Sequence, residues 1–302
     1  MSADLEELLR DGISRLTAEA KLPPDLADRA RRQAARRRKS AIAAVAGTAT
    51  AFAALGVALT MILGSAAGGS PETVRLLAKI ATVAEHQPSA HVRNSQFWYI
   101  KSWVSYSVCD GGSASSKCVL EKPHERQVWQ SVSNQCRTGL AREYGRKIPL
   151  KFSSNYLHCP YRGSMNSPTY RFLQSLPTDP RALLTLIEMD MAGQQPVPEE
   201  AFTTIGDLLN EAIAPPRVSA ALYRAAALIP GVTVVPNATD AIGRHGIAVA
   251  MTDVGIRREW IFSKRTLLYL GERDVKVADG TIFGVSAVLQ RAFVDHAGQI
   301  PR

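Results

Sequence analysis

The sequence predicts an α+β protein, in which N-terminal helices and one transmembrane helix precede an extracytoplasmic, curved antiparallel sheet packed against helices. Three observations predict this fold class. Residues 40–70 carry no ionisable side chain, as is typical of a membrane span. All four cysteines follow that stretch. Strand-like, helix-like and again strand-like segments then succeed one another, which is the order of an α+β domain. We therefore divide the chain into residues 1–39, 40–66 and 71–302.

The first part, residues 1–39, is expected to be a basic helical segment. Leucine and isoleucine recur near helical spacing within residues 4–20. The sequence Lys21-Leu-Pro-Pro-Asp25 ends this helix, and seven Lys and Arg residues lie between Arg29 and Lys39. Two interpretations of residues 4–20 stay open. They form an amphipathic helix that packs on a cytoplasmic protein partner or the membrane surface, or they are a weakly ordered tail.

The segment Ala41 to Gly64 is predicted to cross the membrane and to contact its lipid. Its 24 mainly apolar residues would form a helix roughly 36 Å long, enough for a hydrocarbon core of about 30 Å. A buried core helix is the alternative. The seven basic residues precede this span and Gly64 to Ser70 has none, so the positive-inside rule keeps the N-terminus in the cytoplasm. We expect a single-pass cell-membrane protein with its C-terminal domain outside the cytoplasm.

A cleaved signal peptide competes with this uncleaved anchor. The small residues Ser65-Ala66-Ala67 suit signal peptidase. However, the apolar run is longer than the usual apolar region of roughly 7–15 residues, and the preceding segment is long and helical in pattern. We therefore favour the anchor.

The cysteines Cys109, Cys118, Cys136 and Cys159 indicate an oxidising compartment. An even number of cysteines there predicts two disulfides, with three pairings open. Cys109 and Cys118 bracket a Gly- and Ser-rich loop, so we expect a local bridge between them that leaves Cys136 with Cys159. No Cys-x-x-Cys unit is present, so we expect neither a zinc site nor another cofactor.

The domain after the span is expected to begin with a helix at 71–85. The strand that follows, 96–108, is dense in aromatic and β-branched residues and has apolar groups on both faces. Asp179 is placed to cap a helix that Pro180 opens. Further strands are expected at 126–133, 138–144, 232–235, 246–252, 257–262, 267–270, 275–278 and 282–288, and helices at 179–191, 202–209 and 216–229.

A set of segments spread over this domain resembles a family of uncharacterised single-pass proteins from actinobacteria. The resemblance covers most of the domain and implies a location and a fold, with no established activity. The segments are Leu176-Pro-Thr-Asp-Pro180, Pro230-Gly-Val232, Asp240-Ala-Ile-Gly-Arg244, Ile261-Phe262, Leu270-Gly-Glu-Arg273 and Val294-Asp295.

A more remote resemblance concerns the strand-turn-strand pattern from Trp260 to Tyr269. It is similar to that of periplasmic lipoprotein-carrier and sigma-regulator sensor domains, which implies a curved sheet wrapped over helices. Some anti-sigma proteins share the layout of cytoplasmic segment, single span and external sensor domain, which implies a role in envelope regulation.

Candidate ligand-binding residues are the four tryptophans Trp98, Trp103, Trp129 and Trp260, which could line an apolar cavity. Core packing is the alternative for them. Asp240 and Arg244 could hold a ligand carboxylate or phosphate, and the alternative is a structural ion pair that ties a turn. No catalytic residue is predicted, because the six histidines lack metal-ligand spacing and no Gly-x-Ser-x-Gly motif occurs.

Together these patterns favour a membrane-anchored extracytoplasmic module for sensing or for binding an amphipathic ligand. An extracytoplasmic enzyme of unknown class and a structural envelope protein are the alternatives. An elongated apolar cavity would favour ligand binding, convergent polar groups with shifted pKa values would favour an enzyme, and a filled interface would favour the structural protein. We expect no nucleic-acid partner, because the basic cluster adjoins the span, where anionic lipid head groups attract it.

Overall fold

The computed structural model describes residues 68–109, 118–133, 138–150, 163–190 and 198–301. They belong to the second of two units of the chain, Met61–Arg302. The predicted helix at 4–20, the predicted span 41–64, Cys136 and Cys159 lie outside these ranges. Within them, no helix is long and apolar enough to cross a bilayer.

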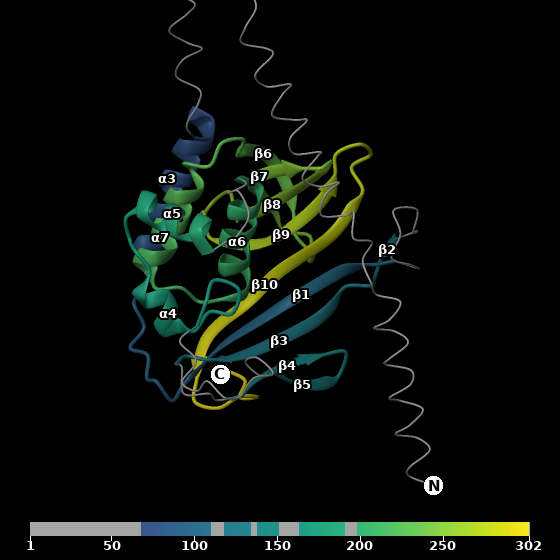
Figure 1. Ribbon diagram of the computed structural model, residues 1–302. Helices are drawn as coiled ribbons and strands as arrows, with labels where there is room; N and C mark the ends of the chain where they lie inside the picture. Colours follow the sequence, from purple (N-terminus) through teal and green to yellow (C-terminus); the bar gives the residue numbers. More distant parts are fainter. Residues whose placement is uncertain (1–67, 110–117, 134–137, 151–162, 191–197, 302) are drawn as a thin grey trace, which may run out of the picture. The chain divides into compact units, whose positions relative to one another are not determined.

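Ten antiparallel strands form one sheet, and Figure 1 shows the helices gathered on one side of it. The order across the sheet is β5-β4-β3-β1-β10-β9-β8-β7-β6, and the short β2 pairs with β1 outside this path. The strands are β1 (Phe97–Cys109), β2 (Cys118–Leu120), β3 (His124–Ser131), β4 (Gly139–Glu143), β5 (Arg146–Leu150), β6 (Thr233–Thr239), β7 (His245–Asp253), β8 (Ile256–Ser263), β9 (Tyr269–Lys276) and β10 (Ile282–Val294).

The sheet consists of two meanders joined by the pairing of β1 with β10. The register places Phe97 opposite Val294 and Tyr106 opposite Gly284. One bulge interrupts this pair between Lys101 and Ser102, where β10 contains an extra residue, Leu289. Because a bulge bends its strand and increases the local twist, the two meanders meet in a curved sheet.

Five helices are described: α3 (Pro71–Glu85), α4 (Tyr170–Ser175), α5 (Pro180–Asp190), α6 (Pro198–Glu211) and α7 (Pro216–Ala226). Side chains cap three of their N-termini. Ser70 accepts from the Thr73 amide of α3, Thr169 from the Phe172 amide of α4, and Asp179 from the Ala182 amide of α5. The predicted cap at Asp179 is therefore confirmed. Such caps satisfy amide groups that a helix start leaves unpaired.

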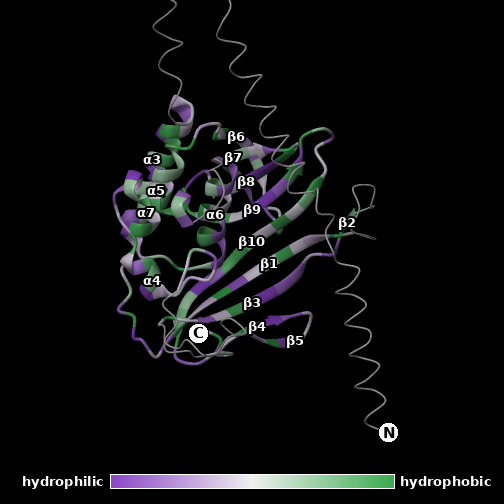
Figure 2. Ribbon diagram, in the orientation of Figure 1, coloured by the Kyte–Doolittle hydropathy of each residue, from purple (hydrophilic) through white to green (hydrophobic). Residues whose placement is uncertain are grey.

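The main core fills the space between the helices and the sheet. It includes Leu77 and Ile80 of α3, Phe202 of α6, and Trp98 and Trp260 of the sheet. Figure 2 shows that strands and helices carry hydrophobic residues interrupted by hydrophilic ones, as expected for elements with one face on a core.

A smaller core lies on the opposite face of the sheet. Phe97, Tyr99, Trp129 and Val294 form it, and the Trp129 indole donates a hydrogen bond of 2.6 Å to the Gln299 carbonyl. The C-terminal segment therefore covers part of this face. This confirms that β1 has apolar groups on both faces, and it identifies one cover of the second face.

Helix α6 approaches the sheet closely at Gly206. The Phe202 ring stacks on the Trp260 indole at 3.8 Å between centroids, and both side chains are fully buried. A methyl group added at Gly206 would collide with the Trp260 indole nitrogen. The missing side chain at Gly206 thus allows the helix to lie against the indole.

The predicted α+β class with a curved antiparallel sheet is confirmed, but several boundaries were wrong. The two strands predicted at 267–270 and 275–278 are replaced by one continuous strand, β9 (Tyr269–Lys276), and β10 extends to Val294. The expected turn at 236–240 lies largely within β6, because a bulge between Val235 and Ala238 accommodates Pro236.

Three short elements, β2, β5 and α4, were missed. Strand β2 has three residues. Strand β5 is almost wholly exposed and so lacks alternation, and α4 has six residues, too few for a helical period.

Cys109 and Cys118 are directly opposite each other in the β1–β2 pair. This register suits the predicted local bridge, since a disulfide needs Cα atoms within about 7 Å. Cys118 has no free thiol. The pairings of Cys109 with Cys118 and of Cys136 with Cys159 both stay predictions.

We predict that Gly206→Ala destabilises the chain by about 1–3 kcal/mol, the usual cost of overpacking a core. Helix propensity alone would stabilise it by about 1 kcal/mol, so the sign of the change decides which effect dominates. Thermal unfolding of the full chain measures it. The penalty should shrink in a Trp260→Phe background, which leaves room for the methyl group, and a higher Tm for Gly206→Ala alone would contradict the close approach.

Candidate functional site

Helix α6 separates two hollows between the helices and the sheet. Leu209 and Ala212 face one of them, while Asp207 and Glu211 face the other. These two sets lie on different faces of the helix because residues three or four apart share a face. The first hollow is mainly apolar, and the second is lined by charged side chains.

The first hollow, which we call the apolar groove, has a volume of about 480 Å³. Helices α3, α6 and α7 form one wall, and strand β10 with the end of the β8–β9 turn forms the other. Apolar and aromatic side chains dominate its lining, among them Ile80, Val83, Ala84, Leu208, Ile213, Tyr223, Leu268, Tyr269, Val288 and Phe293. Its volume falls in the range of small-molecule sites, roughly 300–1,000 Å³.

Arg291 of β10 is the one charged side chain among the described residues that line the apolar groove. Its Nη2 donates to the carbonyls of Leu209 and Asn210 at the end of α6. Its guanidinium also lies over the Tyr269 ring, 5.4 Å from the centroid. A cation at this place complements the partial negative charge at the C-terminus of the helix.

The second hollow, which we call the ionic furrow, is lined by acidic and basic side chains of α6, β3, β8 and β9. Arg126 pairs with Glu211 at 3.1 Å, and Arg258 pairs with Asp274 at 3.0 Å. The furrow contains a small cavity of about 100 Å³ and two wider ones of about 390 Å³ and 680 Å³.

Glu272 lies deep in the ionic furrow. Its Oε1 accepts a 3.1 Å hydrogen bond from the Asn210 amide, while its Oε2 is buried without a partner within the described residues. Burial, which outweighs the nearby Arg258 charge, raises the pKa of the Glu272 carboxyl to about 8. At neutral pH this side chain is therefore mostly protonated.

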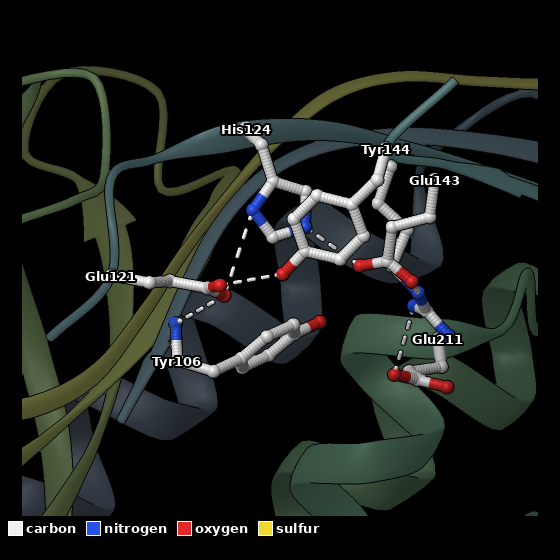
Figure 3. A network of polar contacts seen from close by, with 7 residues as sticks. Tyr106, Glu121, His124, Glu143, Tyr144 and Glu211 are labelled. Atoms are coloured by element: carbon white, nitrogen blue, oxygen red, sulfur yellow. Dashed lines mark hydrogen bonds and ion pairs between the residues drawn. The ribbon is translucent and has the colours of Figure 1, made fainter. Parts of the chain in front are cut away.

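A polar network closes one end of the furrow, where β1, β3 and the β4–β5 turn meet (Figure 3). His124 Nε2 lies 2.8 Å from Glu143, and its Nδ1 lies 3.6 Å from Glu121. The Tyr144 ring stacks on the imidazole at 4.0 Å, and its hydroxyl donates to Glu121 at 2.5 Å. That hydrogen bond is the main reason that the pKa of Tyr144 rises to about 12.

Tyr144 also shows why this end of the furrow has a fixed geometry. It has a positive φ of 49° and precedes Gly145 with φ 72°, as in a type I′ hairpin turn. A left-handed backbone is unfavourable for a bulky side chain. The stacking on His124 and the bond to Glu121 compensate for that cost, and the turn holds the ring over the imidazole.

The four predicted tryptophans do not come together. Trp98 and Trp260 are buried in the main core and Trp129 in the smaller one, and Trp103 projects from the same face of β1 as Tyr99. None of the four lines the apolar groove. Packing accounts for the three buried indoles, and a role in ligand binding stays a prediction.

Asp240 and Arg244 are brought together as a pair. The Arg244 Nε lies 2.5 Å from Asp240 Oδ2, and its Nη2 donates to the carbonyls of Leu270 and Val288 at 2.9 and 3.0 Å. The pair therefore ties the β6–β7 turn to β9 and β10. These contacts give it the structural role that the sequence left as the alternative.

Sequence reasoning did not predict a functional role for Arg291, Glu272 or His124. A lone Arg or Glu in a strand carries no motif, and the strand predicted at 282–288 stopped before Arg291. The pattern Glu121-x-x-His124 was the available signal for the network, but its second carboxylate, Glu143, comes from another strand. Within the described ranges, no group of three His, Cys, Asp or Glu residues is arranged to hold a metal ion.

Comparison with known proteins yields remote structural likenesses alone. No protein-family model and no curated protein matches the sequence. The complex of Pseudomonas aeruginosa MucA and MucB matches at 12% identity and a TM-score of 0.25, covering 76% of this chain and 59% of that one. MucB in complex with MucA(peri) matches at 12% identity and a TM-score of 0.23, covering 76% and 57%.

The chain thus spans less than two thirds of the length of either solved structure. Likeness at this level assigns neither a family nor a function. The resemblance to an actinobacterial family stays a prediction.

We predict that Glu272→Gln stabilises the chain at pH 8 but not at pH 5. The ordinary pKa of a glutamate is 4.5, and the pKa of folded Glu272 is about 8. Between pH 4.5 and about pH 8 the folded chain therefore holds a proton on Glu272 that the unfolded chain has released, so the free energy of unfolding falls as pH rises. Glutamine keeps the acceptor for Asn210 and has no proton to lose. The gain at pH 8 should be on the order of 1 kcal/mol or more.

Chemical denaturation of both proteins across this pH range measures the effect. Glu72→Gln is the control, because its side chain is exposed at the start of α3 and is not among the charges that act on Glu272. A constant difference between Glu272→Gln and the parent chain from pH 5 to pH 8 would contradict the shifted pKa.

Proposed function

We propose that this protein is a membrane-anchored module whose extracytoplasmic domain binds an elongated apolar or amphipathic ligand in the apolar groove. The groove itself carries the proposal. Its walls expose side chains such as Leu268 and Leu289, which are 44% and 38% exposed, to a hollow large enough for a ligand. Apolar surface of this kind gains free energy when a ligand covers it, roughly 25 cal/mol per Å².

The alternatives fit the geometry less well. A structural protein would need a filled interface between sheet and helices, and the groove leaves it open. The protonated Glu272 suits a general acid, so an enzyme is the second candidate. Yet its cavity of about 100 Å³ is smaller than typical small-molecule sites, and no nucleophile lies among its polar neighbours other than hydroxyls such as Ser286.

The membrane anchor completes the proposal. Residues 41–64 would hold the domain at the outer face of the cell membrane, and residues 4–20 would offer a helix to a cytoplasmic protein partner. A ligand outside could then influence a partner inside, which would suit envelope regulation. The absence of charge over residues 40–70 and the basic residues before it support this arrangement.

We predict that a long-chain fatty acid bearing a photoactivatable diazirine will label the groove. The full chain in lipid nanodiscs would be irradiated with this probe, and the labelled peptides would be mapped by mass spectrometry. Labels should fall on groove-lining residues of α3, α7 and β10, because an acyl chain buries its apolar surface there. Labels on the membrane span serve as an internal standard.

The matched variants are Ala84→Phe and Ala78→Phe, which lie on the same helix, α3. Ala84 lines the groove and Ala78 is exposed outside it. The first should abolish groove labelling and the second should leave it unchanged, with similar Tm values. Absence of groove labels in the parent chain, or equal labelling of both variants, would refute the proposed function.

We also predict that protease added to intact cells will remove the domain and leave a membrane-bound fragment that contains residues 1–64. The basic flank keeps that fragment inside. A tag at the N-terminus would be protected until the cells are permeabilised. A soluble mature protein that starts near Ala67 would show instead that the anchor is cleaved.

A further inference from the structure

Arg291 has hydrogen-bonding capacity that the described residues do not use. A guanidinium carries five N–H donors, and the bonds to Leu209 and Asn210 engage Nη2 alone. Nε and Nη1 have no protein acceptor within the described ranges. No carboxylate lines the groove there, and neither of the two acceptors carries a formal charge. The positive charge of Arg291 is therefore without an anionic partner.

Tyr269 provides a second donor at the same place. Its hydroxyl is buried without a hydrogen-bond partner, and its ring lies under the Arg291 guanidinium. Burial raises the pKa of the Tyr269 hydroxyl well above its ordinary value, so the group stays a donor at any physiological pH. A buried donor that lacks an acceptor costs free energy, which an incoming acceptor would recover.

Two β-bulges place both side chains on the groove side of the sheet. In β10, Ser286 and Val288 lie on the same face of the sheet as the even-numbered residues of β1. Because Leu289 is an extra residue, Arg291 rather than Gln290 is the next side chain on that face. In β9, an extra residue at Leu270 produces the same switch, which places Tyr269 on the face of Phe262. A shift of one residue moves a side chain to the opposite face.

We infer that Arg291 and Tyr269 form a carboxylate subsite in the apolar groove, so that the ligand is a long-chain carboxylate. This inference rests on the proposed function of the groove. One guanidinium matches one negative charge, whereas a doubly charged phosphate would call for more cations than this lining provides. The volume of about 480 Å³ suits a single acyl chain better than a two-chain phospholipid.

Arg291 also has a structural role, because it bonds the last carbonyls of α6. The experiment must therefore separate head-group recognition from stability. Selectivity between two probes of equal chain length does so, since loss of stability would lower the labelling by both. The probes are a diazirine-bearing fatty acid, which is ionised at pH 8, and the fatty alcohol of the same length.

In the full chain in nanodiscs at pH 8, the fatty acid should label groove peptides about tenfold more than the alcohol, the ratio expected from one hydrogen-bonded charge pair. Arg291→Gln should bring the two probes to equal labelling, and Arg291→Lys should keep part of the preference. Arg265→Gln, which removes an exposed charge outside the groove lining, should leave it intact.

Equal labelling by acid and alcohol in the parent chain would overturn the carboxylate subsite while the proposed function stands. Retention of the full preference in Arg291→Gln would also overturn it. Failure of both probes to label the groove would refute the proposed function itself. If Arg291→Gln does not fold, Tyr269→Phe provides the test, because loss of one hydroxyl should reduce the preference severalfold without removing the bond to α6.

Discussion

The ion pair between Asp240 and Arg244 fixes the part of the sheet on which the groove depends. The Asp240 side chain is fully buried. The Arg244 guanidinium donates hydrogen bonds to the carbonyls of Leu270 and Val288. These carbonyls lie at the two bulges of β9 and β10, where the extra residues interrupt the ladder. A bulge leaves backbone groups unpaired, and the guanidinium satisfies them. Loss of Arg244 would leave the buried Asp240 carboxylate without its ion pair, which is costly.

The bulges in turn determine which side chains reach the helices. Strict alternation along β10 would carry the face of Val288 on to Gln290 and turn Arg291 away. Each inserted residue shifts the alternation by one position. As a result, Arg291 faces the helices together with Val288, and Tyr269 faces them together with Phe262. The same bulges that curve the sheet thus place the Arg291 guanidinium and the Tyr269 side chain in a mainly apolar groove.

The sequence predicted the class of fold and most elements, because long runs with a clear period reveal which face is buried. The helices 71–85 and 216–229 and the aromatic strand 96–108 are of this kind. The site was less predictable. Its polar residues are placed by β-bulges, which change the face on which a side chain lies, and by pairs between different strands, such as His124 with Glu143. The local hydrophobic pattern of a single sequence reveals neither of these. The tryptophans were predicted as ligand-binding residues because they are large and aromatic. The same large apolar surface favours burial, and three of the four lie in the cores.

The last turn of α6 connects the two hollows. On the groove side, the carbonyls of Leu209 and Asn210 accept from Arg291. On the furrow side, the Asn210 amide donates to Glu272, and Glu211 pairs with Arg126 beside the His124 network. A ligand carboxylate that competes for Arg291 would weaken one set of bonds, and ionisation of Glu272 would alter the other. Because both sets of bonds hold the same helical turn, a ligand at Arg291 and ionisation of Glu272 would both act on the end of α6, which gives each a route to affect the other.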